Sequence, residues 1–167
     1  MTRFYKKQLQ LGFTLVEALV VVTILAILAS LAVPTFSDAL YKQRIQGAAE
    51  AVLSDLRWAR TESIKRNKLV RVTFTTGSTW SYVINVDPLG TPVLIKTVNG
   101  SEYPTTTLTS ASFSGGVSYT TFDPTRGTNP NNGTATITAT NGSLSVRVST
   151  LGRVRICGTV EGYPACS

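Results

Sequence analysis

Three arginines near the C-terminus have the spacing of residues that share one face of a β-sheet. Arg153 and Arg155 flank Val154, and Arg147 belongs to an apolar and polar alternation just before them. Residues two apart on a strand point the same way and lie about 6.6 Å apart. Because the guanidinium group is a planar fork of N–H donors, it suits phosphate oxygens. These residues therefore predict a small surface that binds phosphate groups.

The chain has little other equipment for chemistry. It has 167 residues, no histidine and two cysteines, and 15% of its residues are charged. Without histidine it cannot build a Ser-His-Asp or Cys-His site, and two cysteines alone cannot hold a structural zinc or an iron–sulfur cluster. We therefore expect no enzyme activity, no metal site and no cofactor.

One apolar run dominates the N-terminal part of the chain. Between Phe13 and Val33 lie 21 residues whose one charge is Glu17. As a helix the run is about 31 Å long, enough to cross a bilayer, and the three basic residues before it place the N-terminus in the cytoplasm. The run is either a signal peptide cut after Ala32 or a helix that stays in the chain. A carboxylate at mid-membrane costs about 2.5–3.5 kcal/mol, which favours a retained helix.

A helical pattern continues beyond Pro34 to about Lys65. Apolar residues recur at steps of three to five, which predicts an amphipathic half-helix. Pro34, between the two halves, is expected to kink the long helix that they form. Charged residues, Asp55 among them, are expected largely off this stripe, and Trp58 is expected in the core. The stripe consists of Phe36, Leu40, Ile45, Ala49, Val52, Leu56 and Ala59.

The stretch Gly12-Phe13-Thr14-Leu15-Val16-Glu17 resembles the processing site of type IV prepilins and type II secretion pseudopilins. In that family a prepilin peptidase cuts after the glycine, and the new N-terminal residue is methylated. The resemblance implies a cut between Gly12 and Phe13, methylation of Phe13, and a role in subunit assembly for Glu17. A buried Glu17 carboxylate needs a cation, and the free amine of a neighbouring Phe13 would supply one. The partners implied are other pilins in a filament and, before assembly, the inner membrane.

Four parts follow from these observations. They are a leader peptide over residues 1–12, a membrane-spanning or filament-core half-helix over 13–33, an amphipathic half-helix over 34–66 and a β-rich domain over 67–167. The expected fold class is α+β, a long N-terminal helix packed on antiparallel sheet, consistent with the pilin class. We expect a single-pass precursor with its C-terminal domain in the periplasm, and then a subunit in a pilus at the cell surface.

The β-rich domain begins after Lys68, where the composition changes to Thr, Ser, Val, Gly and Asn. Alternating apolar residues predict strands over 69–75 and 80–86, joined by a hairpin turn, and further strands over 93–98 and 117–122. Glycine, proline and small polar residues predict loops over 99–116 and 123–133.

Two more strands are predicted around Asn141-Gly142, a two-residue hairpin signal. If these two residues form the turn, Ile137 faces Val146, and every apolar side chain falls on one face.

A further strand, over 153–157, follows a loop formed by 150–152. This register pairs Val148 with Val154, and it places Arg147 opposite Arg155 on the other face. Like charges in that position are mildly destabilising.

The motif Gly152-Arg153-Val154-Arg155 resembles the Gly-Arg-x-Arg motif of FimT-type minor pilins, which bind DNA during natural transformation. The resemblance implies that Gly152, Arg153 and Arg155 bind double-stranded DNA, and Arg147 could widen this patch. Because contacts with phosphates carry no base information, we expect this binding to be independent of sequence. Lys96 or Arg126 would join if the fold brings them near. The alternative is a structural minor pilin or a GspH-like pseudopilin that primes or caps a filament without DNA. Its arginines would only protect a sheet edge.

Cys157 and Cys166 can close a small loop just after these arginines. Outside the cytoplasm we expect them to form a disulfide. The disulfide would either staple a fraying terminus or fix the segment next to the arginines, and the two roles are compatible.

Overall fold

The structure, a computed structural model, describes residues 13–140 and 142–166, without the side chains of residues 31–35. The chain divides into two units, of which the first ends at Ser37 and the second runs over Asp38–Ser167. The predicted leader, which includes Gly12, and the predicted kink at Pro34 lie outside what is described.

The N-terminal helix, α1 (Leu15–Arg66), has a defined start and end. Its first turn is capped by the Thr14 hydroxyl, which accepts a hydrogen bond from the Glu17 backbone N–H at 3.2 Å. After Arg66 the chain enters the left-handed region at Asn67, with φ 51°. The Lys68 N–H then donates to the Ser63 carbonyl oxygen at 3.2 Å, which closes a Schellman motif. The end predicted near Lys65 is confirmed.

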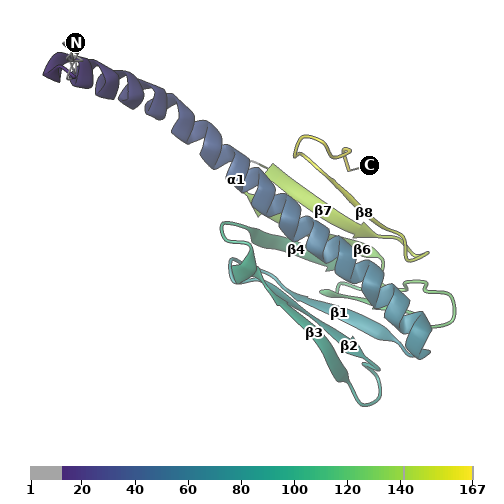
Figure 1. Cartoon of the computed structure of the whole chain (residues 1–167). Coiled ribbons are helices and arrows are strands. Elements are labelled where there is room, and N and C mark those ends of the chain that lie inside the picture. Colours follow the sequence, from purple (N-terminus) through teal and green to yellow (C-terminus); the bar gives the residue numbers. More distant parts are fainter. Residues whose placement is uncertain (1–12, 141, 167) are drawn as a thin grey trace, which may run out of the picture. The chain divides into compact units, whose positions relative to one another are not determined.

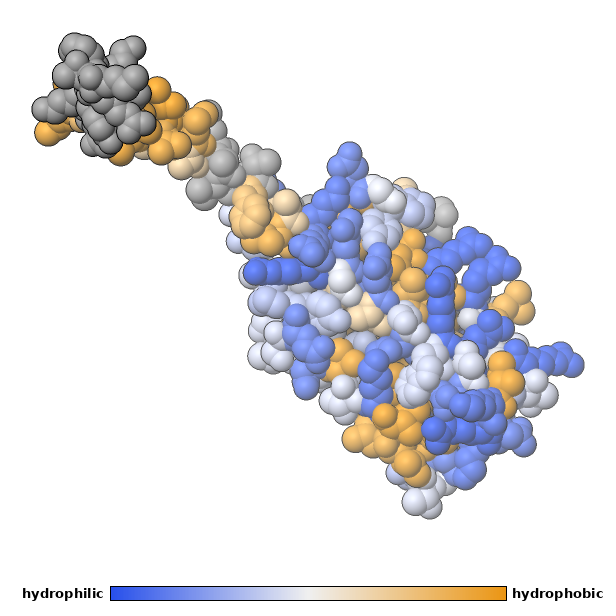
Figure 2. Space-filling model, viewed as in Figure 1, coloured by the Kyte–Doolittle hydropathy of each residue, from blue (hydrophilic) through white to orange (hydrophobic). Residues whose placement is uncertain are grey.

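In the first unit, every residue described from Phe13 to Ser30 is exposed, and Phe13 is exposed to 78%. Figure 2 shows this apolar surface in orange along the helix. Over the part of the chain that the structure describes, no helix is both long and apolar enough to cross a membrane. The span over 13–33 stays a prediction.

In the second unit, α1 buries the predicted stripe from Ile45 to Ala59. Three expectations are wrong. Phe36 precedes the unit and is 66% exposed. Trp58 is 36% exposed. It lies two residues after the buried Leu56, and residues two apart in a helix point to nearly opposite sides. Asp55 is buried, since it lies three residues after Val52 and four before Ala59, on the stripe itself.

The remainder of the second unit consists of two four-stranded antiparallel sheets, and α1 lies over both (Figure 1). The core contains residues from α1 and from both sheets. The first sheet, ordered β3-β2-β1-β5, comprises β1 (Val70–Thr75), β2 (Ser81–Val86), β3 (Val93–Asn99) and β5 (Tyr119–Phe122). The second sheet, ordered β4-β6-β7-β8, comprises β4 (Thr107–Phe113), β6 (Gly133–Ala139), β7 (Gly142–Val148) and β8 (Val154–Gly158). A short 3-10 helix, η1 (Gly100–Glu102), follows β3.

Strand β4 lies inside the segment 99–116, which was predicted to be a loop, and that prediction is wrong. Its two buried apolar residues, Leu108 and Phe113, are five positions apart and would face opposite sides of a regular strand. A bulge between Leu108 and Ser110 adds one residue and returns both side chains to the core face. A period-two pattern cannot detect a strand whose phase changes midway.

The hairpin of β6 and β7 has the predicted faces but a different register. Ile137 pairs with Leu144, and Ala139 pairs with Gly142, so the partners are shifted by two residues from the prediction. A shift of two keeps every side chain on its original face. The apolar pattern therefore could not separate the two registers.

Candidate nucleic-acid interface

The turn between β7 and β8 determines how the arginine motif is presented. The Ser149 N–H donates to the Arg153 carbonyl oxygen at 3.0 Å, which leaves residues 150–152 as the loop. Gly152 closes that loop by donating to the Ser149 carbonyl oxygen at 2.8 Å. Its φ of 72° is in the region that favours glycine. The three-residue loop predicted from the sequence is confirmed.

The register of β7 and β8 brings the three arginines together. Val148 pairs with Val154, and Arg147 pairs with Arg155. The two valines are buried, whereas Arg147, Arg153 and Arg155 are exposed. Since β8 is an edge strand, Arg155 lies at the border of the sheet, and Arg153 directly precedes this strand. The predicted grouping of these three residues is confirmed as geometry.

The three arginines line a groove of about 570 Å³. One wall is the start of β6 with the residues before it, and the other is the C-terminal loop after β8. Among the described residues that line the groove, none is acidic. They are Asn132, Gly133, Thr134, Arg147, Val148, Ser149, Thr150, Leu151, Arg153, Arg155, Ile156, Cys157, Pro164 and Ala165. The groove therefore presents positive charge together with small polar and apolar groups, a combination suited to an anionic chain.

The C-terminal wall of the groove is closed by a disulfide between Cys157 and Cys166, as expected. Inside the loop, the Gly158 N–H donates to the carbonyl oxygen of Pro164, which lines the groove. The disulfide loop therefore contributes directly to the groove.

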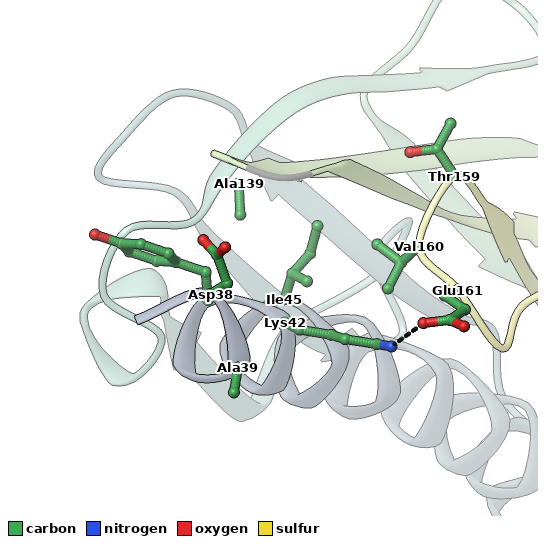
Figure 3. A pocket seen from close by; sticks show the side chains of 9 residues that line it. Asp38, Ala39, Lys42, Ile45, Ala139, Thr159, Val160 and Glu161 are labelled. Atoms are coloured by element: carbon green, nitrogen blue, oxygen red, sulfur yellow. Dashed lines mark hydrogen bonds and ion pairs between the residues drawn. The ribbon is translucent and has the colours of Figure 1, made fainter. Parts of the chain in front are cut away.

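Two contacts with α1 hold the same loop from its other side. Lys42 forms an ion pair with Glu161 at 3.1 Å, across the rim of a second pocket of about 380 Å³ (Figure 3). The Tyr163 hydroxyl donates to Glu50 at 2.9 Å, and burial, followed by this bond, raises the pKa of Tyr163. The disulfide loop is thus fixed between the helix and the groove.

Lys96, one of the two residues predicted as additional cations, forms an ion pair away from the groove. Its ammonium group lies 2.6 Å from the carboxylate of Asp55, which also accepts a hydrogen bond from the Tyr82 hydroxyl at 2.7 Å. Burial, and then the neighbouring Asp55, raise the pKa of Tyr82 far above its usual value. Sequence reasoning missed this polar network, although the position of Asp55 on the buried stripe was a readable signal.

The predicted processing and assembly residues lie at the start of α1. Phe13 and Glu17 are both exposed, and the Glu17 backbone completes the Thr14 cap. The described side chains from 13 to 30 are all exposed, and an apolar surface of this kind would have to be covered outside the membrane.

A long N-terminal helix packed on antiparallel sheets is the architecture of the type IV pilin class. Comparison with protein-family models gives two matches. They are the prokaryotic N-terminal methylation motif over residues 7–33 and the type II transport protein GspH over residues 48–152. The second covers more than half of the chain, and the chain belongs to this GspH family of pseudopilins and minor pilins. Membership implies association with other pilins and processing by a prepilin peptidase.

Two crystal structures of the type IV minor pilin FimU from Pseudomonas aeruginosa PAO1 share the fold. One matches with a TM-score of 0.55 and 22% identity, covering 68% of this chain and 88% of that chain. The other has a TM-score of 0.52 and 22% identity, with coverages of 66% and 90%. The comparison with curated proteins gave no match.

Proposed function

We propose that this chain is a minor pilin of a type IV pilus that binds double-stranded DNA without regard to sequence and so aids DNA uptake in natural transformation. The observation that carries the proposal is the groove beside β8, which contains Arg147, Arg153 and Arg155 and no acidic residue among its described lining. Nucleic-acid backbones are the extended polyanions that such a surface fits.

The expected mode of binding is contact with phosphates. Arg153 and Arg155 lie two residues apart at a sheet edge, about 6.6 Å, which is close to two steps of about 3.4 Å along one DNA strand. Contacts with phosphate carry no base information, so binding should be independent of sequence. Two to four neutralised phosphates predict a slope of log K against log salt of about −2 to −4. Each subunit should bind weakly, and several in one pilus would add avidity.

The proposed site is a local one. Removal of the leader would leave 13 Lys and Arg against 9 Asp and Glu, a side-chain charge of +4. Because this excess is small, general attraction between protein and DNA cannot replace the arginine cluster.

The proposed location follows from the N-terminal segment. The precursor would cross the inner membrane once, with residues 13–33 in the bilayer and the second unit in the periplasm. After a cut between Gly12 and Phe13, the exposed apolar helix would be covered by other pilins. Glu17 would then meet the amine of a neighbouring Phe13.

A second candidate function is a purely structural subunit that primes or caps a pilus or a type II secretion filament. The match to the GspH model over residues 48–152 favours it equally. The two functions differ in one property, since only the first requires the arginine groove to bind DNA.

A salt titration of DNA binding separates them. Full-length chain in non-ionic detergent is titrated against a fluorescent duplex of about 25 base pairs at 50 and 150 mM KCl, alongside Arg153→Gln/Arg155→Gln. Two single variants, Arg155→Gln and Arg44→Gln, are also compared. Each removes one positive charge, so a difference between them reports position and not total charge. Arg44 lies 16 residues before Arg60 on α1, about 24 Å along the helix. We expect the double variant to lose most binding and Arg44→Gln to retain it. Equal binding by wild type and double variant contradicts the site, and absence of binding by wild type supports the structural function.

A further inference from the structure

The loop between β5 and β6, residues 123–132, lies against the turn that presents the arginine motif. The Asn129 N–H donates to the Thr150 carbonyl oxygen at 2.8 Å. On the same side, a Cβ built on Gly152 would lie 2.0 Å from the carbonyl oxygen of Gly127. The carbonyl group of Gly127 is therefore next to Gly152, the residue that precedes Arg153. These two contacts bring together segments more than twenty residues apart in the sequence.

The loop is held in one shape by its own hydrogen bonds. The Gly127 N–H donates to the Asp123 carbonyl oxygen at 2.9 Å, and the Thr125 N–H donates to the Asp123 carboxylate at 2.8 Å. The Gly127 carbonyl oxygen accepts from Arg60 Nε of α1 at 3.0 Å. Gly127 itself has a φ of 62°, in the region that favours glycine. Arg126 is thus carried by a fixed turn.

The Arg126 side chain is available for a ligand. It is exposed, and no ion pair links it to an acidic residue within the described ranges. Arg60, the other arginine at this place, differs because its guanidinium is bound to Gly127. Lys96, which lies on β3 of the other sheet, is paired with Asp55 of α1. Arg126 is therefore a cation that the fold brings near the arginine motif from a distant part of the sequence. Arg57 of α1 comes near it too, but its guanidinium donates to the Val154 carbonyl oxygen at 3.4 Å.

The loop also leads directly into the groove. It continues to Asn132, which lines the groove beside the start of β6. An anionic chain lying along Arg153 and Arg155 would pass the turn at residues 150–152 and meet this loop next. An extended ligand is needed to contact both places, because they come from separate segments of the surface.

We propose that Arg126 is a further phosphate-contacting residue of this surface and extends it beyond the turn between β7 and β8. The inference rests on the proposed DNA binding, and it deepens it by naming a contact outside the Gly-Arg-x-Arg motif. The ligand feature recognised is the phosphodiester backbone, so Arg126 should strengthen binding to any sequence by a similar factor. The guanidinium fork is suited to such a contact, and a lysine would supply charge without the fork.

The test uses full-length Arg126→Gln, with Arg44→Gln as the matched loss of one charge and Arg126→Lys as the charge-retaining variant. The dissociation constant for the same fluorescent duplex is measured between 50 and 200 mM KCl. The leader charges are present in every variant and do not affect the comparison. We expect Arg126→Gln to bind about two- to fivefold more weakly at low salt, as for loss of one exposed charge contact. Its salt slope should be shallower by about 0.9, and Arg126→Lys should restore the slope.

The outcomes separate this inference from the proposed function. If Arg126→Gln matches Arg44→Gln while Arg153→Gln/Arg155→Gln loses binding, the DNA site stands and Arg126 is not part of it. If wild type and the double variant bind equally, the proposed function fails and the inference fails with it. A weaker Arg126→Gln whose salt slope is unchanged also overturns the inference, because the lost contact would not be with a phosphate.

Discussion

Gly152 packs directly against the carbonyl oxygen of Gly127, so closely that a Cβ at residue 152 would lie 2.0 Å from that oxygen. The glycine of the arginine motif therefore has two physical reasons to be glycine, a φ of 72° and this contact. It determines the position of Arg153 and need not touch a ligand itself.

Replacement of Gly152 by alanine should therefore be unusually destabilising. Gly116 is a matched control, because its φ is 70° and a Cβ there meets no atom within 4 Å. We expect Gly116→Ala to cost about 1–2 kcal/mol of unfolding free energy and Gly152→Ala about 3 kcal/mol or more, since the second adds a steric clash. Urea unfolding measures both. Equal losses would show that the contact with Gly127 is not tight.

The polar network of Asp55, Tyr82 and Lys96, which joins α1 to the first sheet, should be important for stability. Asp55→Ala leaves the buried Tyr82 hydroxyl without its acceptor and Lys96 without its carboxylate. We expect a loss of about 2–3 kcal/mol, moderated because Lys96 is partly exposed. Tyr82→Phe, which leaves the ion pair intact, should cost about 1 kcal/mol. Chemical unfolding of both variants gives the comparison, and a neutral Asp55→Ala would contradict this assignment.

The dependence of stability on pH should include a contribution from Glu62. Hydrogen bonding from Arg66 Nε at 2.6 Å lowers the pKa of Glu62 below its usual 4.5, partial burial opposes this shift, and Lys65 adds to it. Because the pKa is lowered in the folded state, the stabilisation is present above pH 4.5 and is lost as the pH falls through the folded-state value.

Glu62→Gln should consequently lower the free energy of unfolding at pH 7. The difference in this free energy between wild type and variant should become smaller towards pH 3. Urea unfolding at pH 7, 5 and 3 measures it. Glu161→Gln, at an exposed ion pair, should change stability little at any of these values. A difference for Glu62→Gln that stays constant with pH would assign the effect to packing.

The disulfide should stabilise the second unit. Cys157 and Cys166 are nine residues apart in the sequence, and the chain-entropy estimate for such a loop is about 2–3 kcal/mol. Wild type treated with a thiol reductant should unfold like Cys157→Ser/Cys166→Ser, and the reductant should leave that variant unchanged. If reduction does not alter wild-type unfolding, the loop is held by its contacts with α1 instead.

Processing is tested by the intact mass of the chain recovered from the cell. We expect a mature chain that begins at Phe13 and carries one added methyl group. Gly12→Val should remain uncut, because the family's peptidase cuts after glycine. A mature chain that begins at Val33 would show that the apolar run is an ordinary signal peptide.

Much of the fold could be predicted from local patterns. The buried stripe from Ile45 to Ala59 follows the helical period, and the register of β7 and β8 follows from a three-residue loop and alternating valines. These predictions succeeded because each depends on residues that are close in the sequence, within one helix or within two strands joined by a short loop. Strand β4 was missed because its bulge interrupts the period-two pattern. The two-residue shift between β6 and β7 was missed because it leaves every side chain on its original face.

Local sequence patterns were enough to predict that Arg153 and Arg155 share a face, that Arg147 lies opposite Arg155, and that an apolar helix with a methylation motif precedes them. Side-chain direction along a strand is a local property, so no tertiary information was required. The folded structure was needed to show that Lys96 is paired with Asp55, that Gly152 packs on Gly127, and that the loop containing Arg126 lies beside the arginine motif. These relationships join segments separated by 25 or more residues, and they arise from how the helix, sheets and loops pack together, which no local period encodes.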